Sequence, residues 1–345
     1  MKQSKSASMG LIETSARIIS AASVVGKCEY EGPLGAFFDL HDDTDRFGQS
    51  TWEQSESEMQ RRALSIAMKK RSIRAENLDA IFAGDLLNQC TGAAYGLSEF
   101  GAPYFGLYGA CSTSAEGLTL GAMTVSGGCL DVAAAVTSSH NCSAERQFRT
   151  PIEYGGQRPP SAQWTVTGAG AFILSRDRSD SPFVSSDDPL ICRVMPGIVT
   201  DKGISDPNNM GAAMAPAAID TLTRFFRVSG STPDDYDLIL TGDLGRVGSE
   251  ILTAMMKAEG FDISRVHNDC GMLIYSGLSS PDVNSGGSGC GCAASVLASY
   301  AIPKLRIGAL KDILFIATGA MMSTTSLQQG LTIPGIAHLL HIKRK

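Results

Sequence analysis

Apolar runs alternate along the chain with amphipathic stretches, and this alternation predicts the fold class. Residues 16–25 and 78–83 are typical of buried strands. Between them, Thr51 and Gln54 have the spacing of a capping box for a helix that runs to about Lys70. Because strands that alternate with helices form largely parallel sheets covered by helices, we predict an α/β protein.

Residues 108–116 predict a tight turn that delivers a cysteine to the start of a helix. Residues 104–108 have strand character, and residues 113–126 have the composition of a buried helix. Backbone N–H groups and the helix dipole favour negative charge at a helix N-terminus, so Cys111 is expected to have a lowered pKa or to help capture an anion. The alternative is that Cys111 is a small buried hydrophobe, as free cysteines usually are.

Two segments of the sequence recur at a fixed offset. Residues 79–86 match residues 237–244, 158 positions later, and residues 111–137 match residues 292–318, 181 positions later. Both copies of the longer match read as a turn, a helix of small residues, a glycine and an apolar strand. We therefore predict a duplicated strand–helix–strand unit.

The ends of the two copies set the predicted domain organisation. The glycine-rich strand 165–174 closes the first copy, and residues 333–342 close the second. The span 175–190 between them is rich in Ser, Asp and Pro, so we predict an N-terminal half, 1–182, that contains the Cys111 helix and a C-terminal half, 183–345.

The second copy differs from the first inside its helix. Pro303 is expected to kink or end that helix at about Ile302, because proline lacks the N–H that a helix interior needs. In such sheets ligands bind beyond the carboxyl ends of the strands. The residues predicted at those ends are Gly84, Asp85, Ser138, Ser139, His140, Gly242, Asp243, Thr318 and Gly319.

Composition and charge exclude several classes of function. The net charge is −6 and the 29 Lys and Arg residues are scattered, so the electrostatic footprint of a nucleic-acid-binding protein is missing. Nine cysteines without zinc-like spacing indicate reduced thiols in an intracellular protein. No apolar run reaches the roughly 18 residues of a membrane span, and no signal peptide is expected before Glu13.

Several strings of the sequence carry a resemblance to a known family. They are residues 32–35, 83–89, 109–114, 137–141, 144–149, 153–157, 214–218 and 235–244. On these strings the chain resembles the thiolase-like superfamily, which includes the ketoacyl synthase III condensing enzymes. Within that superfamily it is similar to the stage V sporulation protein AD family of spore-forming bacteria.

The resemblance implies both a fold and a function. The fold is a duplicated five-layer αβαβα arrangement. The function is uptake of dipicolinic acid into the developing spore, as a ligand-binding part of the spore inner-membrane transport assembly. The implied partners are dipicolinic acid and the other proteins of that assembly, so the protein would be peripheral to the membrane. The resemblance also implies a homodimer that forms through the edge of the first-half sheet.

Condensing enzymes of this superfamily use a cysteine with His-His or His-Asn partners. The resemblance implies that the nucleophile is retained as Cys111. It also implies that Gly242 stands at the histidine position and Cys290 at the asparagine position. Losing one donor to a developing oxyanion typically costs roughly 10²–10³ in rate, and the base that activates the thiol is lost as well. We therefore expect a non-catalytic binding protein that needs no cofactor.

Two other functions remain open. One is an acyl-thioester condensing or transferring enzyme of the ketoacyl synthase III type that uses Cys111. The other is a scaffold that joins membrane partners and binds no small molecule.

Dipicolinate is a flat pyridine with two carboxylates, so its site needs hydrogen-bond donors around a flat slot. The helix start at Cys111 is predicted to receive one carboxylate, beside Cys290. Ser139 and His140 are predicted to donate to the other carboxylate, and Asn88 to bridge them. His140 has an alternative role as a satisfied turn residue.

Four charged residues complete the predicted site. Arg146 and Arg149 suit bidentate pairing with a carboxylate, although Arg146 also suits a local ion pair with a neighbouring glutamate. Asp85 and Asp243 would repel a free dianion, so they favour a calcium-bearing ligand or else cap the helices that follow them. No residue set of the sequence predicts a metal site belonging to the protein itself.

Overall fold

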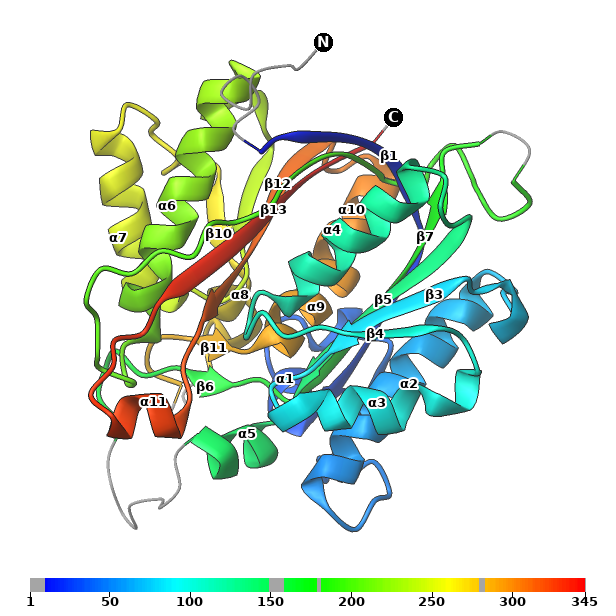
Figure 1. The fold of residues 1–345 in the computed structure, drawn as a ribbon, viewed down its shortest axis with the longest axis horizontal. Helices are drawn as coiled ribbons and strands as arrows, with labels where there is room; N and C mark the ends of the chain where they lie inside the picture. Colours follow the sequence, from blue (N-terminus) through cyan, green and yellow to red (C-terminus); the bar gives the residue numbers. More distant parts are fainter. Residues whose placement is uncertain (1–9, 149–157, 179–180, 279–282, 345) are drawn as a thin grey trace.

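A computed structural model describes residues 10–148, 158–178, 181–278 and 283–344 (Figure 1). Within them, one mixed sheet of 11 strands runs through the whole molecule. Its order is β10 (His267–Asp269), β9 (Leu238–Thr241), β12 (Asp312–Ala320), β13 (Gly335–Lys343), β8 (Leu190–Met195), β1 (Ile12–Gly26), β7 (Gly168–Arg176), β5 (Val132–Ser139), β3 (Ala80–Gly84) and β4 (Tyr104–Gly106), with β2 (Leu40–Asp42) beside β1.

The strand order repeats on the two sides of the β1–β8 pair. In the first half β3 is parallel to β5 and β5 is antiparallel to β7. In the second half β9 is parallel to β12 and β12 is antiparallel to β13. The antiparallel pairing of β1 with β8 makes the sheet continuous between the halves. The predicted boundary segment, 175–190, runs from the end of β7 to the start of β8, and the division at residue 182 stays a prediction.

Helices lie in three layers around this sheet. The helices α2 (Trp52–Lys70) and α3 (Thr91–Leu97) cover one outer face, and α6 (Met210–Ser229) and α7 (Gly245–Ala258) cover the other. Between the two halves of the sheet lie α4 (Thr113–Ser126) and α9 (Cys290–Val296). The predicted five-layer α/β architecture is thus the observed one.

Three separate hydrophobic cores fill the spaces between these five layers. Strand β5 shows how one strand serves two cores, because successive side chains point to opposite faces. Val132, Ala134 and Val136 join the core under α2, while Ala133 and Ala135 join the central core with α4 and α9. A strand buried on both faces reads as a continuous apolar run, which is why residues 132–136 were recognisable in the sequence.

Shorter elements complete the described chain. Helices are α1 (Lys27–Tyr30), α5 (Asn141–Phe148), α8 (Cys270–Tyr275), α10 (Ile302–Ile307) and α11 (Thr324–Gln328), and β6 (Trp164–Thr165) pairs with β11 (Gly287–Ser288). Short 3₁₀ turns are Gly35–Phe37, Ala75–Asn77, Asn88–Cys90, Ser98–Phe100 and Pro233–Asp235.

The helix starts follow the sequence signals. At α2, the Gln54 amide donates to the Thr51 hydroxyl over 3.3 Å, as a capping residue should allow. The second-copy helix is irregular where Pro303 was expected to kink or end it. A π-helical turn, Leu297–Ala301, interrupts the α-helix, and α10 begins at Ile302 with Pro303 in its first turn, where a missing N–H is tolerated.

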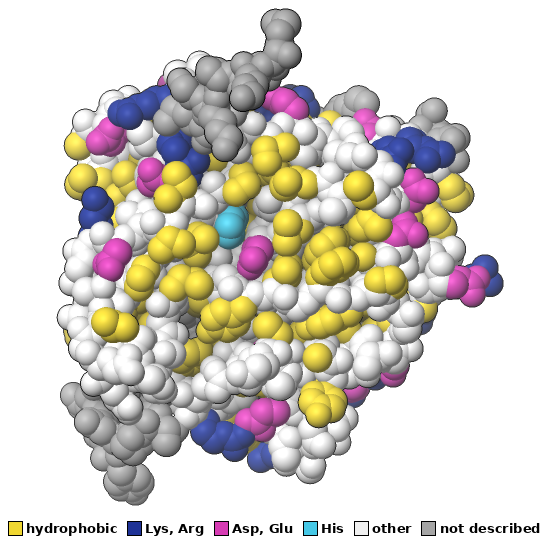
Figure 2. All heavy atoms as spheres, viewed as in Figure 1, with side chains coloured by type: hydrophobic (Ala, Val, Ile, Leu, Met, Phe, Trp, Pro, Cys, Tyr) yellow, Lys and Arg dark blue, Asp and Glu magenta, His cyan; other side chains and the backbone are white. Residues whose placement is uncertain are grey.

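The face crossed by α4 is apolar across its middle. Figure 2 shows hydrophobic side chains in a broad band there, with most Lys, Arg, Asp and Glu side chains nearer the rim. Tyr104 and Phe105 of β4 are exposed, and Leu120 and Met123 of α4 are half-buried. In the part of the chain that the structure describes, no helix has the length and apolar character needed to cross a membrane.

Candidate functional site

The turn before α4 places Cys111 at the centre of the candidate site. Ser112 is the N-cap residue of α4, and Cys111 immediately before it is 5% exposed. Its sulfur lies 3.9 Å from the hydroxyl oxygen of Ser288, which belongs to β11 in the other half. The Ser288 hydroxyl donates to the Asp243 carboxylate over 3.2 Å. The structure therefore joins residues that are far apart in the sequence.

Asp243 is a buried carboxylate with a full set of donors. The Gly289 amide donates to it over 2.9 Å and the Thr318 hydroxyl over 2.8 Å. Burial raises the pKa of Asp243 to about 6, while these donors act in the opposite direction. Asp243 is thus mainly ionised at neutral pH.

The Cys111 thiol is protonated rather than activated. Burial raises its pKa well above the usual value, and the negative charge of Asp243, to which the thiol donates, raises it further. The expectation of a lowered pKa at this helix start is therefore wrong. Burial and the Asp243 carboxylate both disfavour the thiolate, and together they outweigh the favourable effect of the helix dipole.

Gly242 and Cys290, the positions that the resemblance assigns to the catalytic partners, offer no general base. A Cβ atom on Gly242 would lie 3.0 Å from the Cα of Ala317 and 3.2 Å from the Cβ of Ala293, so the site has no room for a histidine. Cys290 is fully buried, and its thiol donates to the Ser138 carbonyl over 2.9 Å. Burial raises the pKa of Cys290 well above its usual value.

Apolar side chains cover the two thiols. Leu86, Ala144 and Phe148 pack with Cys111 and Cys290 in one small cluster, separate from the three main cores. Leu86 follows β3, whereas Ala144 and Phe148 belong to α5. We call the place that these five residues occupy the Cys111 pocket, and their own side chains fill it in this structure.

Ser139 and His140, the donors predicted at the end of β5, have protein partners. The Ser139 hydroxyl donates to the Val166 carbonyl over 2.7 Å and accepts the Gly291 amide over 3.2 Å. His140 is buried, and its Nε2 lies 2.9 Å from the Asp45 carbonyl oxygen while its Nδ1 accepts the Cys142 amide over 3.2 Å. Burial lowers the pKa of His140, so the ring is neutral at neutral pH.

Asp85 and Asp243 occupy matching places in the sequence repeat but have different partners. Asp85 accepts the Leu87 amide over 2.8 Å and the Ala93 amide over 2.6 Å, which fixes the entry to α3. Asp243 does not cap α7. Asp269 does so instead, by accepting the first amides of that helix.

The remaining predicted residues lie around the pocket. Asn88 lies in the turn before α3, and its backbone amide donates to the side chain of Gln147 over 2.9 Å. Arg146 of α5 forms an ion pair with Glu53 of α2. Arg149 lies outside the described residues. The roles of all these residues in ligand binding stay predictions.

Glu56 is a site residue that the sequence did not reveal. It is fully buried on α2, and its carboxyl accepts the Ser138 hydroxyl over 3.0 Å and the Ser143 hydroxyl over 2.8 Å. Glu56 lies three residues before Met59 and seven before Ala63, so the helical period places it on the buried face of α2, and this spacing is the signal that could have found it. Ser288 is a second such residue, and its hydroxyl faces the Cys111 sulfur.

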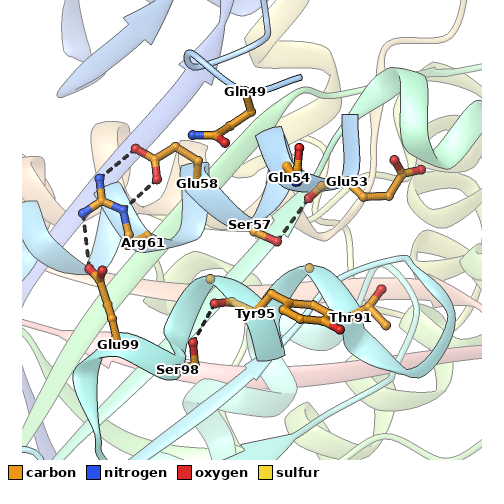
Figure 3. Close-up of a pocket in the computed structure, with 12 residues that line it drawn as sticks. Gln49, Glu53, Gln54, Ser57, Glu58, Arg61, Thr91, Tyr95, Ser98 and Glu99 are labelled. Atoms are coloured by element: carbon orange, nitrogen blue, oxygen red, sulfur yellow. Dashed lines mark hydrogen bonds and ion pairs between the residues drawn. The ribbon is translucent and has the colours of Figure 1, made fainter. Parts of the chain in front are cut away.

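A second hollow lies on the surface between α2 and α3 (Figure 3). It measures about 600 Å³, and its rim carries an ion pair of Arg61 with Glu58 and another with Glu99. None of the predicted site residues lines it. No group of three or more His, Cys, Asp or Glu side chains among the described residues is arranged to hold a metal ion.

Comparison with known proteins identifies the relatives of this chain. A family model described as stage V sporulation protein AD matches residues 6–343. A protein of that name from Bacillus subtilis (strain 168) is 44% identical over 321 residues, which cover 92% of this chain and 91% of the relative.

Two solved structures of other proteins share the fold. A variant of OleA from Xanthomonas campestris matches with a TM-score of 0.60 at 15% identity, covering 97% of this chain and 99% of that one. The 3-oxoacyl-[acyl-carrier-protein] synthase III from Aquifex aeolicus VF5 matches with a TM-score of 0.55 at 14% identity, covering 94% and 99%. The predicted thiolase-like fold is thereby confirmed.

Proposed function

Because this chain belongs to the stage V sporulation protein AD family, we propose that it is a non-catalytic protein that binds dipicolinic acid for uptake into the developing spore. Sporulation is the setting that family membership gives. The ligand and the lack of turnover are our proposal.

One observation carries the proposal that the site does not turn over thioesters. The Cys111 thiol donates to a carboxylate and has a raised pKa, while the two partner positions hold Gly242 and a buried thiol, Cys290. A nucleophile needs a base or a lowered pKa, and this thiol has neither. These features support a site that retains the cysteine without the groups that would make it reactive.

The charge of the pocket bears on the form of the ligand. Asp243 is mainly ionised and lies next to Cys111, so a free dianion entering the Cys111 pocket would meet a buried negative charge. The calcium complex of dipicolinate is neutral and would avoid this repulsion. We therefore propose that the complex binds more tightly than the free acid.

Titration calorimetry with dipicolinate, with and without calcium, tests the proposal. We expect heat of binding that is larger or saturates earlier with calcium, and no heat at millimolar ligand would refute it. Replacement of Cys111 by leucine fills the pocket and should weaken binding by at least tenfold. Replacement of the exposed Cys129 by leucine is the matched control and should leave binding unchanged.

We also propose that the protein works as a homodimer and attaches to the spore inner membrane through partner proteins. The outer edge of β4 is the end of the sheet among the described strands, and its exposed Tyr104 and Phe105 side chains suit a protein interface.

A further inference from the structure

The cover of the Cys111 pocket consists of two short segments. One is residues 86–90, which connect β3 to α3, and the other is α5. We call these two segments the lid. Leu86 from the first and Ala144 and Phe148 from the second contact the thiols below. A ligand can reach Cys111 from this side only when the lid moves.

The side chain of Gln147 joins the two segments of the lid. Its amide nitrogen donates to the Leu86 carbonyl over 2.8 Å, and its amide oxygen accepts the Asn88 amide over 2.9 Å. The first segment also contains two non-glycine residues in the left-handed region, Gln89 with a φ of 58° and Cys90 with a φ of 52°. Such conformations persist only where the surroundings enforce them.

Both segments are anchored on the same buried pair of acids, Glu56 and Asp85, which we call the carboxyl pair. Asp85 holds the first segment by accepting the Leu87 amide, and Glu56 holds α5 by accepting the Ser143 hydroxyl. The two acids meet at α3. A Cβ atom on Gly92 would lie 3.1 Å from a carboxylate oxygen of Asp85 and 3.3 Å from the Cγ of Glu56.

We propose that the carboxyl pair is a proton-operated latch for the lid. While one of the two acids is protonated, the lid stays closed over the Cys111 pocket, and when both are ionised the lid is released and the pocket opens. This inference rests on the proposed function only for the identity of the ligand that enters.

Electrostatics supports the latch. Burial raises the pKa of both acids, and the charge of Asp85 raises that of Glu56 further. The hydroxyl and amide donors act in the opposite direction but are outweighed, so the closed pair holds a proton more tightly than exposed acids would. Two carboxylates in one buried site repel each other strongly, and the repulsion falls on the groups that hold the lid. An open lid would expose Glu56 to water and return its pKa toward the ordinary range.

The direction of the pH dependence follows from these shifts. The closed state binds a proton that the open state releases, so closure is favoured at low pH and weakens as the pH rises above the ordinary glutamate pKa. Release of one proton changes the opening equilibrium by up to roughly tenfold per pH unit within that window.

Four other titratable groups around the pair do not change charge in this range. They are Cys90, Tyr104, Tyr108 and Cys290, whose pKa values are all raised above their usual alkaline values. Burial also raises the pKa of Glu116 of α4. Glu116 acts on Cys90 and is separate from the two acids that anchor the lid. Replacing Glu56 alone therefore isolates the latch.

Hydrogen exchange on the full chain, read by mass spectrometry at about pH 6 and about pH 8.5, tests the latch. Rates are divided by the intrinsic rate at each pH to give protection factors. In the unmodified protein we expect protection of α5 to fall by at least tenfold between the two pH values. In Glu56→Gln, which keeps the shape but cannot ionise, protection should stay at its low-pH value. Glu58→Gln, also on α2 but paired with Arg61 and Arg62, should behave as the unmodified protein.

Ser143→Ala provides a second test that does not alter charge. It removes one anchor of α5 and should lower protection at both pH values. Equal protection of α5 at the two pH values in the unmodified protein, or an unchanged pH response in Glu56→Gln, would overturn the latch. This readout needs no ligand, so a failure of dipicolinate to bind would refute the proposed function and leave the latch standing.

Discussion

At Cys111 the neighbouring carboxylate determines what the residue can do. Its sulfur lies at a helix start, the position that in many enzymes activates a thiol. Here the Asp243 charge and complete burial keep the proton on sulfur. A cysteine in this state is an apolar surface with a weak donor, which is the role that the proposed binding site requires of it.

The reactivity of the cysteines should show this directly. With iodoacetamide at about pH 7.5, the exposed Cys129 is expected to be alkylated at least a hundredfold faster than Cys111, because alkylation needs an accessible thiolate. Peptide mass spectrometry gives both rates in one sample. Comparable rates, or an acyl adduct on Cys111 after incubation with acyl-coenzyme A, would instead favour the condensing enzyme.

The sequence predicted which residues lie at the site better than it predicted their protonation and burial. Cys111, Asp243 and Cys290 were named from the repeat and the resemblance, and the structure brings them to one place. The raised pKa of Cys111 could not be predicted from the sequence. Asp243, which contributes to it, is distant in the sequence, and nothing local indicates that the thiol is buried next to a carboxylate. Glu56 was missed because a glutamate is usually exposed, although its spacing from Met59 and Ala63 places it on the buried face of α2.

Among the elements, β7 and α9 make the closest contact that positions the site. A Cβ atom on Gly170 would lie 2.6 Å from backbone and side-chain atoms of Ala294, and one on Gly291 would lie 2.1 Å from the Gly168 carbonyl oxygen. These glycines let the second-copy helix lie directly against the first-half sheet. Cys290 reaches Ser138 because of this contact.

Gly170→Ala is therefore expected to destabilise the protein. The added methyl group has no space and must push the helix from the strand, which typically costs about 1–3 kcal/mol. The free energy of unfolding in urea measures the effect. Gly117→Ala on α4 is the control, because its Cβ would meet no atom nearer than 3.4 Å and alanine is the better helix former. Equal stability of the two variants would contradict the contact.

Helices and strands with a regular spacing of apolar residues were predicted well. Features that depend on tertiary packing were predicted less well. The bounds of α4 and the start of α2 agree with local signals, namely a run of small apolar residues and a capping threonine. At Pro303 the sequence predicted a kink or an end at about Ile302, and a π-helical turn does precede α10, which begins at Ile302. That the chain continues as a helix beyond this turn depends on the packing around it, which the local sequence does not contain.

For the whole molecule, the free edge of β4 has the largest consequence for assembly. Tyr104 and Phe105 lie on it, and Phe105 is 53% exposed. An edge strand with exposed aromatic residues pairs readily with another chain unless something covers it. A second copy that pairs there would bury these side chains and extend the sheet.

Phe105→Asp should therefore shift the protein from dimer to monomer. A charge on each of two facing edges would have to be desolvated and would repel its counterpart. Sedimentation equilibrium gives the molar mass of both proteins. Phe37→Asp, which changes an exposed phenylalanine away from the edge, is expected to leave the mass unchanged. A monomeric unmodified protein at tens of micromolar would rule out this interface.

The hydrogen-bonded pair β1–β8 has a consequence for how the chain can be divided. The two halves repeat one topology, but neither could end at the β1–β8 pair without an unpaired strand edge. Each half supplies the strand that pairs with the edge of the other. A fragment that stops near residue 182 would leave the long β1 strand with a bare edge and the central core uncovered on one side. The pattern of strands still shows the duplication, but we expect the two copies to fold and unfold as one cooperative unit.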